Sequence, residues 1–173
     1  MKPGHVVLVG LPGAGKTTAG RGAAAELGVG FVDLDERIAT AAGRSVPDII
    51  AQDGEAAFRE RERDAMRETL AGPPTVIAPG SGWAAQPGNL DAVEGKGLVV
   101  YLAVTPAIAA RRLGDANGRP LLAGAPLLDR LTELQGRREK YFRRAEYTVA
   151  TDEGTARQVA TLIAGLARTH GGL

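Results

Sequence analysis

Residues 6–17 read VVLVGLPGAGKT, a short apolar run that leads into a glycine-rich turn ending in Lys16 and Thr17. A β-branched run of this length predicts a buried parallel strand. The turn matches the pattern G-x-x-x-x-G-K-[ST], in which successive backbone N–H groups surround phosphate oxygens. Residues 16–27 then predict a helix, whose positive N-terminal end also favours phosphate. This stretch therefore predicts a nucleotide-binding α/β fold.

Four further apolar runs alternate with helical patterns along the chain. The predicted strands cover residues 31–35, 75–78, 98–104 and 147–150, and a long charged helix is predicted over 53–70. Strands that alternate with helices are typical of an α/β fold with a parallel sheet. Because we find neither an internal repeat nor a linker, residues 1–173 are expected to form a single domain.

The composition excludes several classes of function. Hydrophobic residues make up 44% of the chain and charged residues 24%, which is typical of a globular protein. The chain has no cysteine, which excludes disulfides, thiolate metal sites and cysteine nucleophiles. A net charge of +1 gives no reason to expect a nucleic-acid partner. No apolar run approaches the roughly 18 residues that span a bilayer, so we expect no membrane association and a cytoplasmic location.

Two aspartates are candidates for chemistry at the end of the second predicted strand. Period-2 alternation over residues 31–35 puts Asp33 and Asp35 on one face. Because ligands of open α/β sheets lie beyond the carboxyl ends of the strands, this pair can serve a magnesium-phosphate site and a hydroxyl acceptor. A solvent-facing strand end, or a cap for a helix that begins near Glu36, is the alternative.

Two other features have both a functional and an ordinary interpretation. Arg59 and Glu62 lie three residues apart on one helix face, where they can form a ligand site or a solvated ion pair. Gly80-Ser81-Gly82 follows the third predicted strand, where it can bring backbone N–H groups against a ligand or form an ordinary turn. The residues alone therefore do not say whether the phosphoryl group passes to water, a protein or a small molecule.

Several segments in a fixed order resemble the shikimate kinase family over nearly the whole chain. They are GLPGAGKTT, FVDLDERI, GRSVPDIIAQDGEAAFRERE, APGSGW, NGRPLLAG, and Arg137 with Tyr141 and Ala145 at four-residue intervals. This ordered set is far more specific than the phosphate-binding turn, which very many families share. The resemblance implies a three-layer α/β/α P-loop kinase fold with a five-stranded parallel sheet in the order 2-3-1-4-5.

The resemblance also implies a reaction. It is transfer of the γ-phosphoryl group of ATP to the 3-hydroxyl of shikimate, which gives shikimate 3-phosphate and ADP on the route to chorismate and aromatic amino acids. Magnesium is the implied cofactor, and ATP and shikimate are the implied partners of a monomer. Substrate-binding helices are expected at about 36–70 and a mobile lid at about 113–126. A kinase for another small polyol acid such as gluconate, or a nucleotide-binding module without transfer activity, is the alternative.

The roles of individual residues follow from the same resemblance. ATP would be bound by Gly13, Ala14, Gly15, Lys16, Thr17, Thr18, Arg112 and Arg119. Shikimate would be bound by Asp35, Arg59, Gly80, Ser81, Gly82 and Arg137, with Glu62 orienting Arg59. Thr17 and Asp33 would serve the metal, and the catalytic residues would be Lys16, Asp35 and Arg119. These residue types suit the chemistry, because arginine binds carboxylates bidentately and phosphoryl transfer needs mainly alignment and charge neutralisation.

The chain departs from the family pattern at three places. The family usually has three glycines where Ser81 interrupts the turn, and a serine costs roughly 1–2 kcal/mol if that position needs a positive φ. Glu139 replaces the usual proline two residues after the carboxylate-binding arginine. Arg138 beside Arg137 makes the substrate arginine ambiguous by one residue, and the spacing to Tyr141 favours Arg137.

Overall fold

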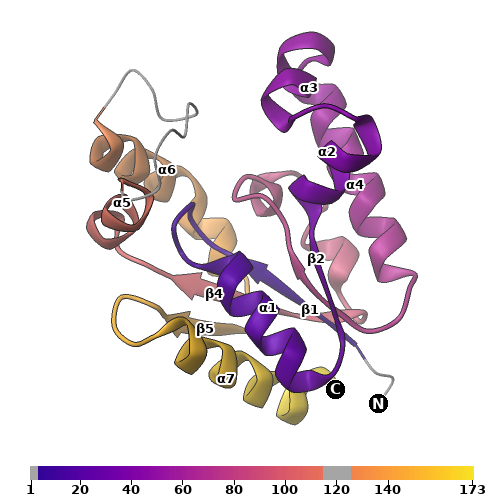
Figure 1. Cartoon of the computed structure of the whole chain (residues 1–173), viewed down its shortest axis with the longest axis vertical. Coiled ribbons are helices and arrows are strands. Elements are labelled where there is room, and N and C mark those ends of the chain that lie inside the picture. Colours follow the sequence, from indigo (N-terminus) through magenta and orange to yellow (C-terminus); the bar gives the residue numbers. More distant parts are fainter. Residues whose placement is uncertain (1–3, 115–125) are drawn as a thin grey trace.

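Five parallel strands form one sheet in the computed structural model, which describes residues 4–114 and 126–173. The order is β2-β3-β1-β4-β5, as the family resemblance implies (Figure 1). All strand pairs are parallel, and the central strand β1 is buried throughout, which explains the apolar run that follows its first residue, His5. The strands are β1 (His5–Val9), β2 (Gly30–Asp33), β3 (Thr75–Ala78), β4 (Gly97–Ala103) and β5 (Tyr147–Ala150).

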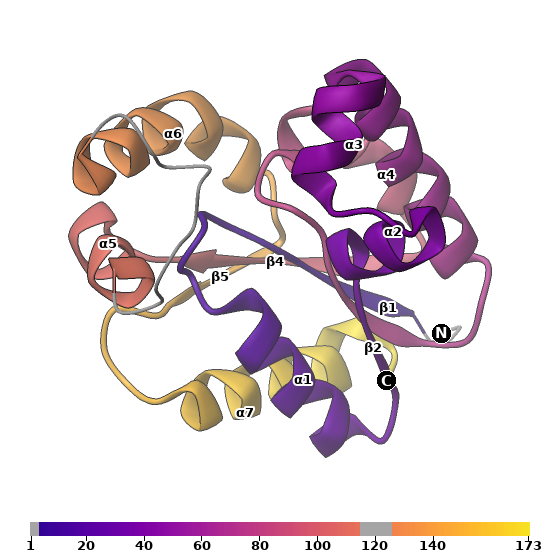
Figure 2. The same cartoon turned by 45° about the horizontal axis from the view of Figure 1, so that its top comes forward.

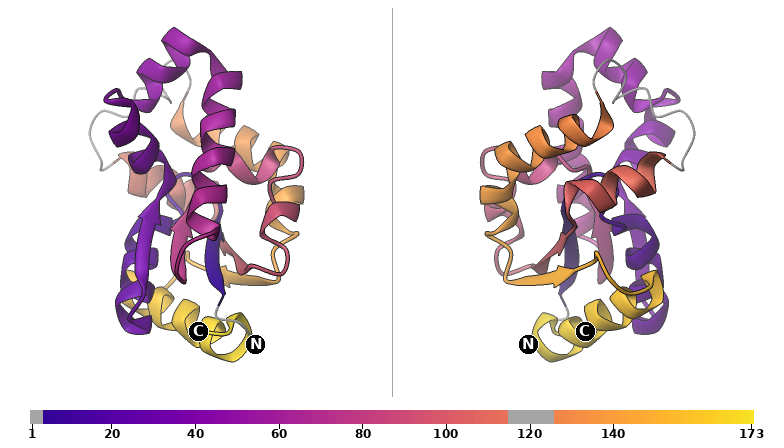
Figure 3. Two further views of the ribbon diagram at one scale, coloured as in Figure 1. Left: turned by 90° about the vertical axis from the view of Figure 1, so that its right-hand side faces the viewer. Right: turned by 90° about the vertical axis from the view of Figure 1, so that its left-hand side faces the viewer.

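Helices cover both faces of this sheet. On one face α1 (Lys16–Leu27) packs beside α7 (Ala156–Leu166), which a π-helical turn extends over Ala167–Gly171 (Figure 2). The other face carries α4 (Glu55–Leu70) and α6 (Leu127–Phe142), and the two side views show the sheet between the two layers (Figure 3). The remaining elements on the described part of the chain are α2 (Leu34–Ala42), α3 (Val46–Asp53), α5 (Pro106–Gly114) and single 3-10 turns at Trp83–Ala85 and Asp91–Val93.

The long charged helix that the sequence predicts over 53–70 is present as α4, but it begins at Glu55. Asp53 is the last residue of α3, and Gly54, with φ of +91°, separates it from α4. The N–H of Gly54 donates to the carbonyl of Ile50, while its own carbonyl accepts from Phe58 N–H. Helices α2 and α3 extend beyond the carboxyl end of β2 (Figure 1), on the side where parallel sheets bind ligands.

The end of β2 also differs from the prediction. The strand stops at Asp33, and Leu34 already begins α2, so Asp35 lies in the first turn of a helix. Strand alternation is therefore the wrong reason for placing Asp33 and Asp35 together. Asp33 is the N-cap of α2, and its Oδ1 accepts from Glu36 N–H at 3.1 Å, as the alternative interpretation expected.

A continuous apolar core holds these layers together. Its largest fully buried side chains include Trp83 and Phe142, and burial of one large apolar side chain stabilises a fold by roughly 1.5–3 kcal/mol. The core therefore fixes the ends of β1, β2 and β3, where the polar residues singled out above converge.

Among the described residues, no helix combines the length and the apolar character that crossing a bilayer requires.

Candidate active site

The glycine-rich turn joins the end of β1 to the start of α1. Gly13 and Gly15 have φ of +82° and +89°, a region that residues with a Cβ rarely adopt. Gly15 is the N-cap of α1 and supplies no side chain, so the first N–H groups of the helix have no side-chain cap. Lys16 Nζ donates to the carbonyls of Gly10 and Leu11, each at 2.8 Å, which folds its ammonium group back along the turn. This combination of amides, helix end and ammonium is suited to a polyphosphate.

Thr17 and Asp33 connect the phosphate-binding turn to the end of β2. Thr17 Oγ1 donates to Asp33 Oδ2 at 3.0 Å. The carboxylate thus binds Thr17 through one oxygen and caps α2 through the other. A hydroxyl and a carboxylate oxygen beside a phosphate site are hard oxygen donors of the kind that Mg²⁺ takes, so these two residues fit the metal.

A charged cluster lies next to this pair on α4. Glu62 is fully buried, the side chain of Arg59 is 16% exposed, and Arg59 Nη1 donates to Glu62 Oε2 at 2.7 Å. The alternative that Arg59 and Glu62 form a solvated ion pair on the surface is therefore wrong. Burial raises the pKa of Glu62 to about 7, with Asp35 adding to the shift and Arg59 and Arg138 opposing it. Glu55 makes a second, longer contact of 3.4 Å with Arg59 Nη2.

Asp35 lies in the same cluster. Burial raises its pKa and the nearby carboxylate of Asp33 adds to this, whereas Lys16 and Arg59 oppose it. A raised pKa makes the ionised carboxylate a stronger base than an ordinary aspartate. Asp35 Oδ1 and Glu62 Oε1 are both buried without a hydrogen-bond partner in the described part of the chain. Buried polar atoms of this kind are typical of sites that bind a ligand.

The turn after β3 approaches these charged groups closely. A Cβ at Gly80 would lie 3.1 Å from both carboxylate oxygens of Asp35, and one at Gly82 would lie 2.7 Å from Arg59 Nη2. Both glycines thus let the turn lie close to these charged groups. Ser81 does not have a positive φ, because every described residue with a positive φ is a glycine. The expected backbone strain at Ser81 is therefore absent.

A cavity of about 470 Å³ joins the phosphate-binding turn to Asp35 and the turn after β3. Its lining includes Lys16, Thr17, Thr18, Asp33, Asp35, Gly80, Ser81 and Arg112. Pro12, Pro79 and Leu113 also line it, although no pattern in the sequence singled them out. An anion-binding turn and a carboxylate placed to accept from a hydroxyl therefore share one space, as transfer between two small molecules requires.

Comparison with known proteins agrees with this geometry. The family model described as shikimate kinase matches residues 12–166. A shikimate kinase of Thermobifida fusca is 44% identical over 158 residues, which cover 91% of each chain. The chain belongs to the shikimate kinase family.

Solved structures give the same result for the fold. The shikimate kinase of Acinetobacter baumannii in complex with shikimate matches with a TM-score of 0.89 and 34% identity, over 97% of this chain and 94% of that one. A gluconokinase of Sinorhizobium meliloti matches with a TM-score of 0.61 and 24% identity, over 96% and 93% of the two chains. At that identity the gluconokinase shares the fold alone.

The family pattern and the structure differ over the arginine on α6. Arg138 Nη1 donates to Ser81 Oγ at 2.7 Å, whereas the Arg137 side chain is 70% exposed and pairs with Glu133 at 2.7 Å. Among the described residues it is therefore Arg138 that reaches the turn after β3, and the expected contact of Arg137 with the substrate stays a prediction. Helical phase is the reason, because the fully buried Leu131 and Phe142 lie seven residues before and four after Arg138. Tyr141, whose spacing favours Arg137, lies outside the fully buried set.

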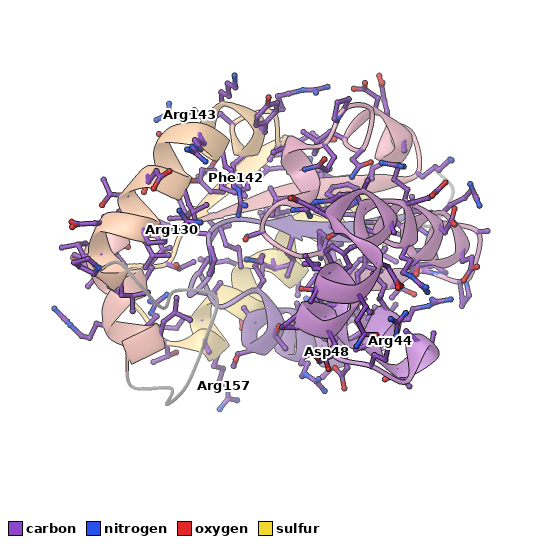
Figure 4. All side chains as sticks on the ribbon, turned by 90° about the horizontal axis from the view of Figure 1, so that it is seen from above. Arg44, Asp48, Arg130, Phe142, Arg143 and Arg157 are labelled. Carbon is purple, nitrogen blue, oxygen red and sulfur yellow. The ribbon has the colours of Figure 1, made fainter. Side chains whose placement is uncertain are left out.

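Arg112 lies beside the phosphate-binding turn. Arg112 Nη1 donates to the carbonyl of Gly13 at 3.2 Å, and its Nη2 donates to the carbonyl of Thr151. Thr151 is a partner that the sequence did not single out. Arg119, with most of the predicted lid over 113–126, lies outside the described residues. Figure 4 shows Arg130 of α6 on one side of the molecule and Arg44 and Asp48, from the region of α2 and α3, on the other.

Proposed function

We propose that this chain transfers the γ-phosphoryl group of ATP to the 3-hydroxyl of shikimate, releasing shikimate 3-phosphate and ADP. The observation that carries the proposal is the shared cavity, which has the phosphate-binding turn at one end and Asp35 with the turn after β3 at the other. Membership of the shikimate kinase family supports the substrate pair. The product would enter the synthesis of chorismate and aromatic amino acids.

The ATP side acts through alignment and positive charge. Residues Gly13, Ala14 and Gly15 would direct backbone N–H groups at the phosphates, followed by Lys16, Thr17 and Thr18 at the start of α1. Lys16 would turn from the carbonyls of the loop toward the β- and γ-phosphates, where it neutralises the charge that moves to the leaving group. Arg112, held against Gly13, would border the adenine side, and Arg119 would contact the transferring phosphate.

Thr17 and Asp33 would hold the magnesium ion of the nucleotide. Their contact at 3.0 Å supports this role, because both oxygens already converge beside Lys16. When bound, Mg²⁺ supplies positive charge to the phosphate oxygens. Asp33 is held in place for this by its second bond, to the N-terminus of α2.

The acceptor side acts through carboxylates and guanidinium groups. Asp35 would accept a hydrogen bond from the 3-hydroxyl and take its proton as the oxygen bonds to phosphorus, a role that its raised pKa supports. Arg59 and Arg138 would bind the carboxylate of shikimate, with Glu62 fixing the orientation of Arg59. Gly80 and Gly82 admit these groups because neither has a side chain.

Some properties inferred from the family stay as proposals. We keep a single domain over 1–173, substrate-binding helices over about 36–70 and a lid over about 113–126 that closes on ATP. Closure of such a lid would exclude water and suppress hydrolysis of ATP. A monomeric state and a cytoplasmic location are likewise proposed.

A substrate panel tests the function. ADP release would be followed with ATP and magnesium in the presence of shikimate, gluconate or no acceptor, and the product would be examined by phosphorus NMR. We expect release that depends on shikimate and a new phosphomonoester at the 3-position. Release that depends on gluconate would identify a kinase of another polyol acid, and ATP binding without turnover on any acceptor would identify a nucleotide-binding module.

A further inference from the structure

Three arginines near the acceptor site differ in how their charge is balanced. Arg59 bonds to Glu62 and Glu55, and Arg137 bonds to Glu133, so each has a carboxylate partner. Arg138 has none among residues 4–114 and 126–173, where the hydroxyl of Ser81 is its one hydrogen-bond partner. Arg138 is therefore held by a neutral group and keeps its full positive charge for a ligand.

The surroundings of Arg138 make this contact necessary. Burial lowers its pKa, and the positive charges of Arg59 and Arg130 lower it further against the opposing effect of Glu62 and Glu55. A guanidinium group in such a place tends to turn toward solvent unless something holds it. The bond to Ser81 joins α6 to the turn after β3, two segments 57 residues apart in the sequence. It thereby fixes a long side chain that has several rotatable bonds.

The hydroxyl group suits this role better than the alternatives. A serine oxygen has two lone pairs and one O–H donor, so it can accept from Arg138 and still donate to a substrate oxygen. A carboxylate at the same position would hold Arg138 equally well, but it would neutralise the charge and repel an anionic substrate. A glycine at this position would leave the guanidinium unheld. Because Ser81 has no positive φ, its side chain adds the contact without backbone strain.

We propose that Ser81 is a positioning residue that holds Arg138, through a neutral hydrogen bond, to receive the carboxylate of the acceptor substrate. This inference rests on the proposed function, since it takes shikimate as the acceptor. Ser81, which interrupts the glycine turn, would thus help to select an anionic substrate. The role requires both the Ser81 oxygen and the charge of Arg138.

Steady-state kinetics on the full chain test the proposal. Ser81→Ala is expected to raise the KM for shikimate about tenfold, as loss of one hydrogen bond to a charged group predicts. The KM for ATP and the kcat should change by less than about twofold, because neither depends on the carboxylate contact. Ser81→Thr keeps the hydroxyl and should restore the wild-type KM. A KM for shikimate that is unchanged in Ser81→Ala would overturn the inference.

A double-mutant cycle shows whether Ser81 acts through Arg138. In an Arg138→Ala background, Ser81→Ala should raise the KM for shikimate no further, whereas independent effects of the two changes would contradict the positioning role. Arg137→Ala is the matched control, since its side chain is exposed and bonded elsewhere. Failure of wild-type protein to use shikimate would overturn the proposed function instead.

A measurement without substrate completes the test. Nitrogen NMR of arginine side chains, with Arg138→Lys used for assignment, should show restricted rotation of the Arg138 guanidinium in the wild type. Ser81→Ala should release that rotation. Identical spectra for the two proteins would mean that the serine does not hold the arginine, whatever the acceptor is.

Discussion

The two ends of the cavity are built in different ways. At the phosphate end, the binding groups come from one continuous stretch, Gly10 to Thr17, and most of them are backbone amides. At the acceptor end the lining comes from Asp35 of α2 and the turn after β3, and the side chains of Arg59 on α4 and Arg138 on α6 lie against that turn. The first end is fixed by local backbone geometry, while the second exists only after the elements have packed together.

This difference suits the two ligands. A triphosphate offers many equivalent oxygens, so amides and one ammonium group recognise it well wherever such a loop occurs. A small polyol acid offers one carboxylate and a few hydroxyls, which need donors and acceptors at particular places. Mutations at the phosphate end should therefore act on every acceptor alike, and those at the acceptor end should act on one substrate.

Lys16→Met should have the largest effect on activity, and it should impair only the phosphate end of the cavity. Loss of the ammonium group removes stabilisation of the moving charge, and we expect kcat/KM to fall about a thousandfold. Shikimate binding measured by calorimetry without nucleotide should change little, because the acceptor groups lie on other elements. A comparable loss of shikimate binding would contradict the separation of the two ends.

Asp35→Asn breaks the acceptor end while keeping its shape. The amide can still contact the hydroxyl but cannot take its proton, so kcat should fall about a hundredfold. ATP affinity, measured by titration with a fluorescent analogue, should stay within about twofold of the wild type. Asp48→Asn, an exposed change on α3, is the matched control. A normal kcat in Asp35→Asn would remove the proposed role.

A comparison of Arg138→Lys with Arg137→Lys tests which position on α6 belongs to the acceptor end. Lysine keeps the charge but loses the planar fork, so Arg138→Lys should raise the KM for shikimate about tenfold. Arg137→Lys should change it by less than about twofold, because the Arg137 side chain is 70% exposed. Initial rates at saturating ATP measure both. The reverse order would restore the assignment that the spacing to Tyr141 suggested.

Sequence reasoning succeeded where the structure depends on neighbours in the chain. The turn over residues 10–17, the strands and the sheet order were predicted from motif, periodicity and family resemblance. It failed where a contact depends on packing. Helical phase on α6 puts Arg138 rather than Arg137 beside Ser81, and a helix rather than a strand carries Asp35. The burial of Glu62 follows from how α4 docks on the turn after β3, which no spacing shows.

The smallest expected effect is a pH dependence confined to the acceptor end. The pKa of Glu62 is raised from its model-compound value of 4.5 to about 7. The folded protein therefore holds a proton there that the unfolded chain loses, and this group's contribution to stability falls as pH rises from about 4.5 to about 7, then stays level. Thermal unfolding of wild type and Glu62→Gln over this range should show the fall in the wild type only.

The same proton affects the substrate. When Glu62 is protonated, the charges of Arg59 and Arg138 lose one of the carboxylates that oppose them, so the cluster becomes more positive and attracts a carboxylate more strongly. The KM for shikimate should therefore fall a few-fold between pH 8 and pH 6, while the KM for ATP stays level over the same range. Glu62→Gln keeps a hydrogen-bond acceptor for Arg59 without the titration, and its KM for shikimate should not vary with pH. A parallel shift of both KM values in the wild type would place the titrating group at the phosphate end.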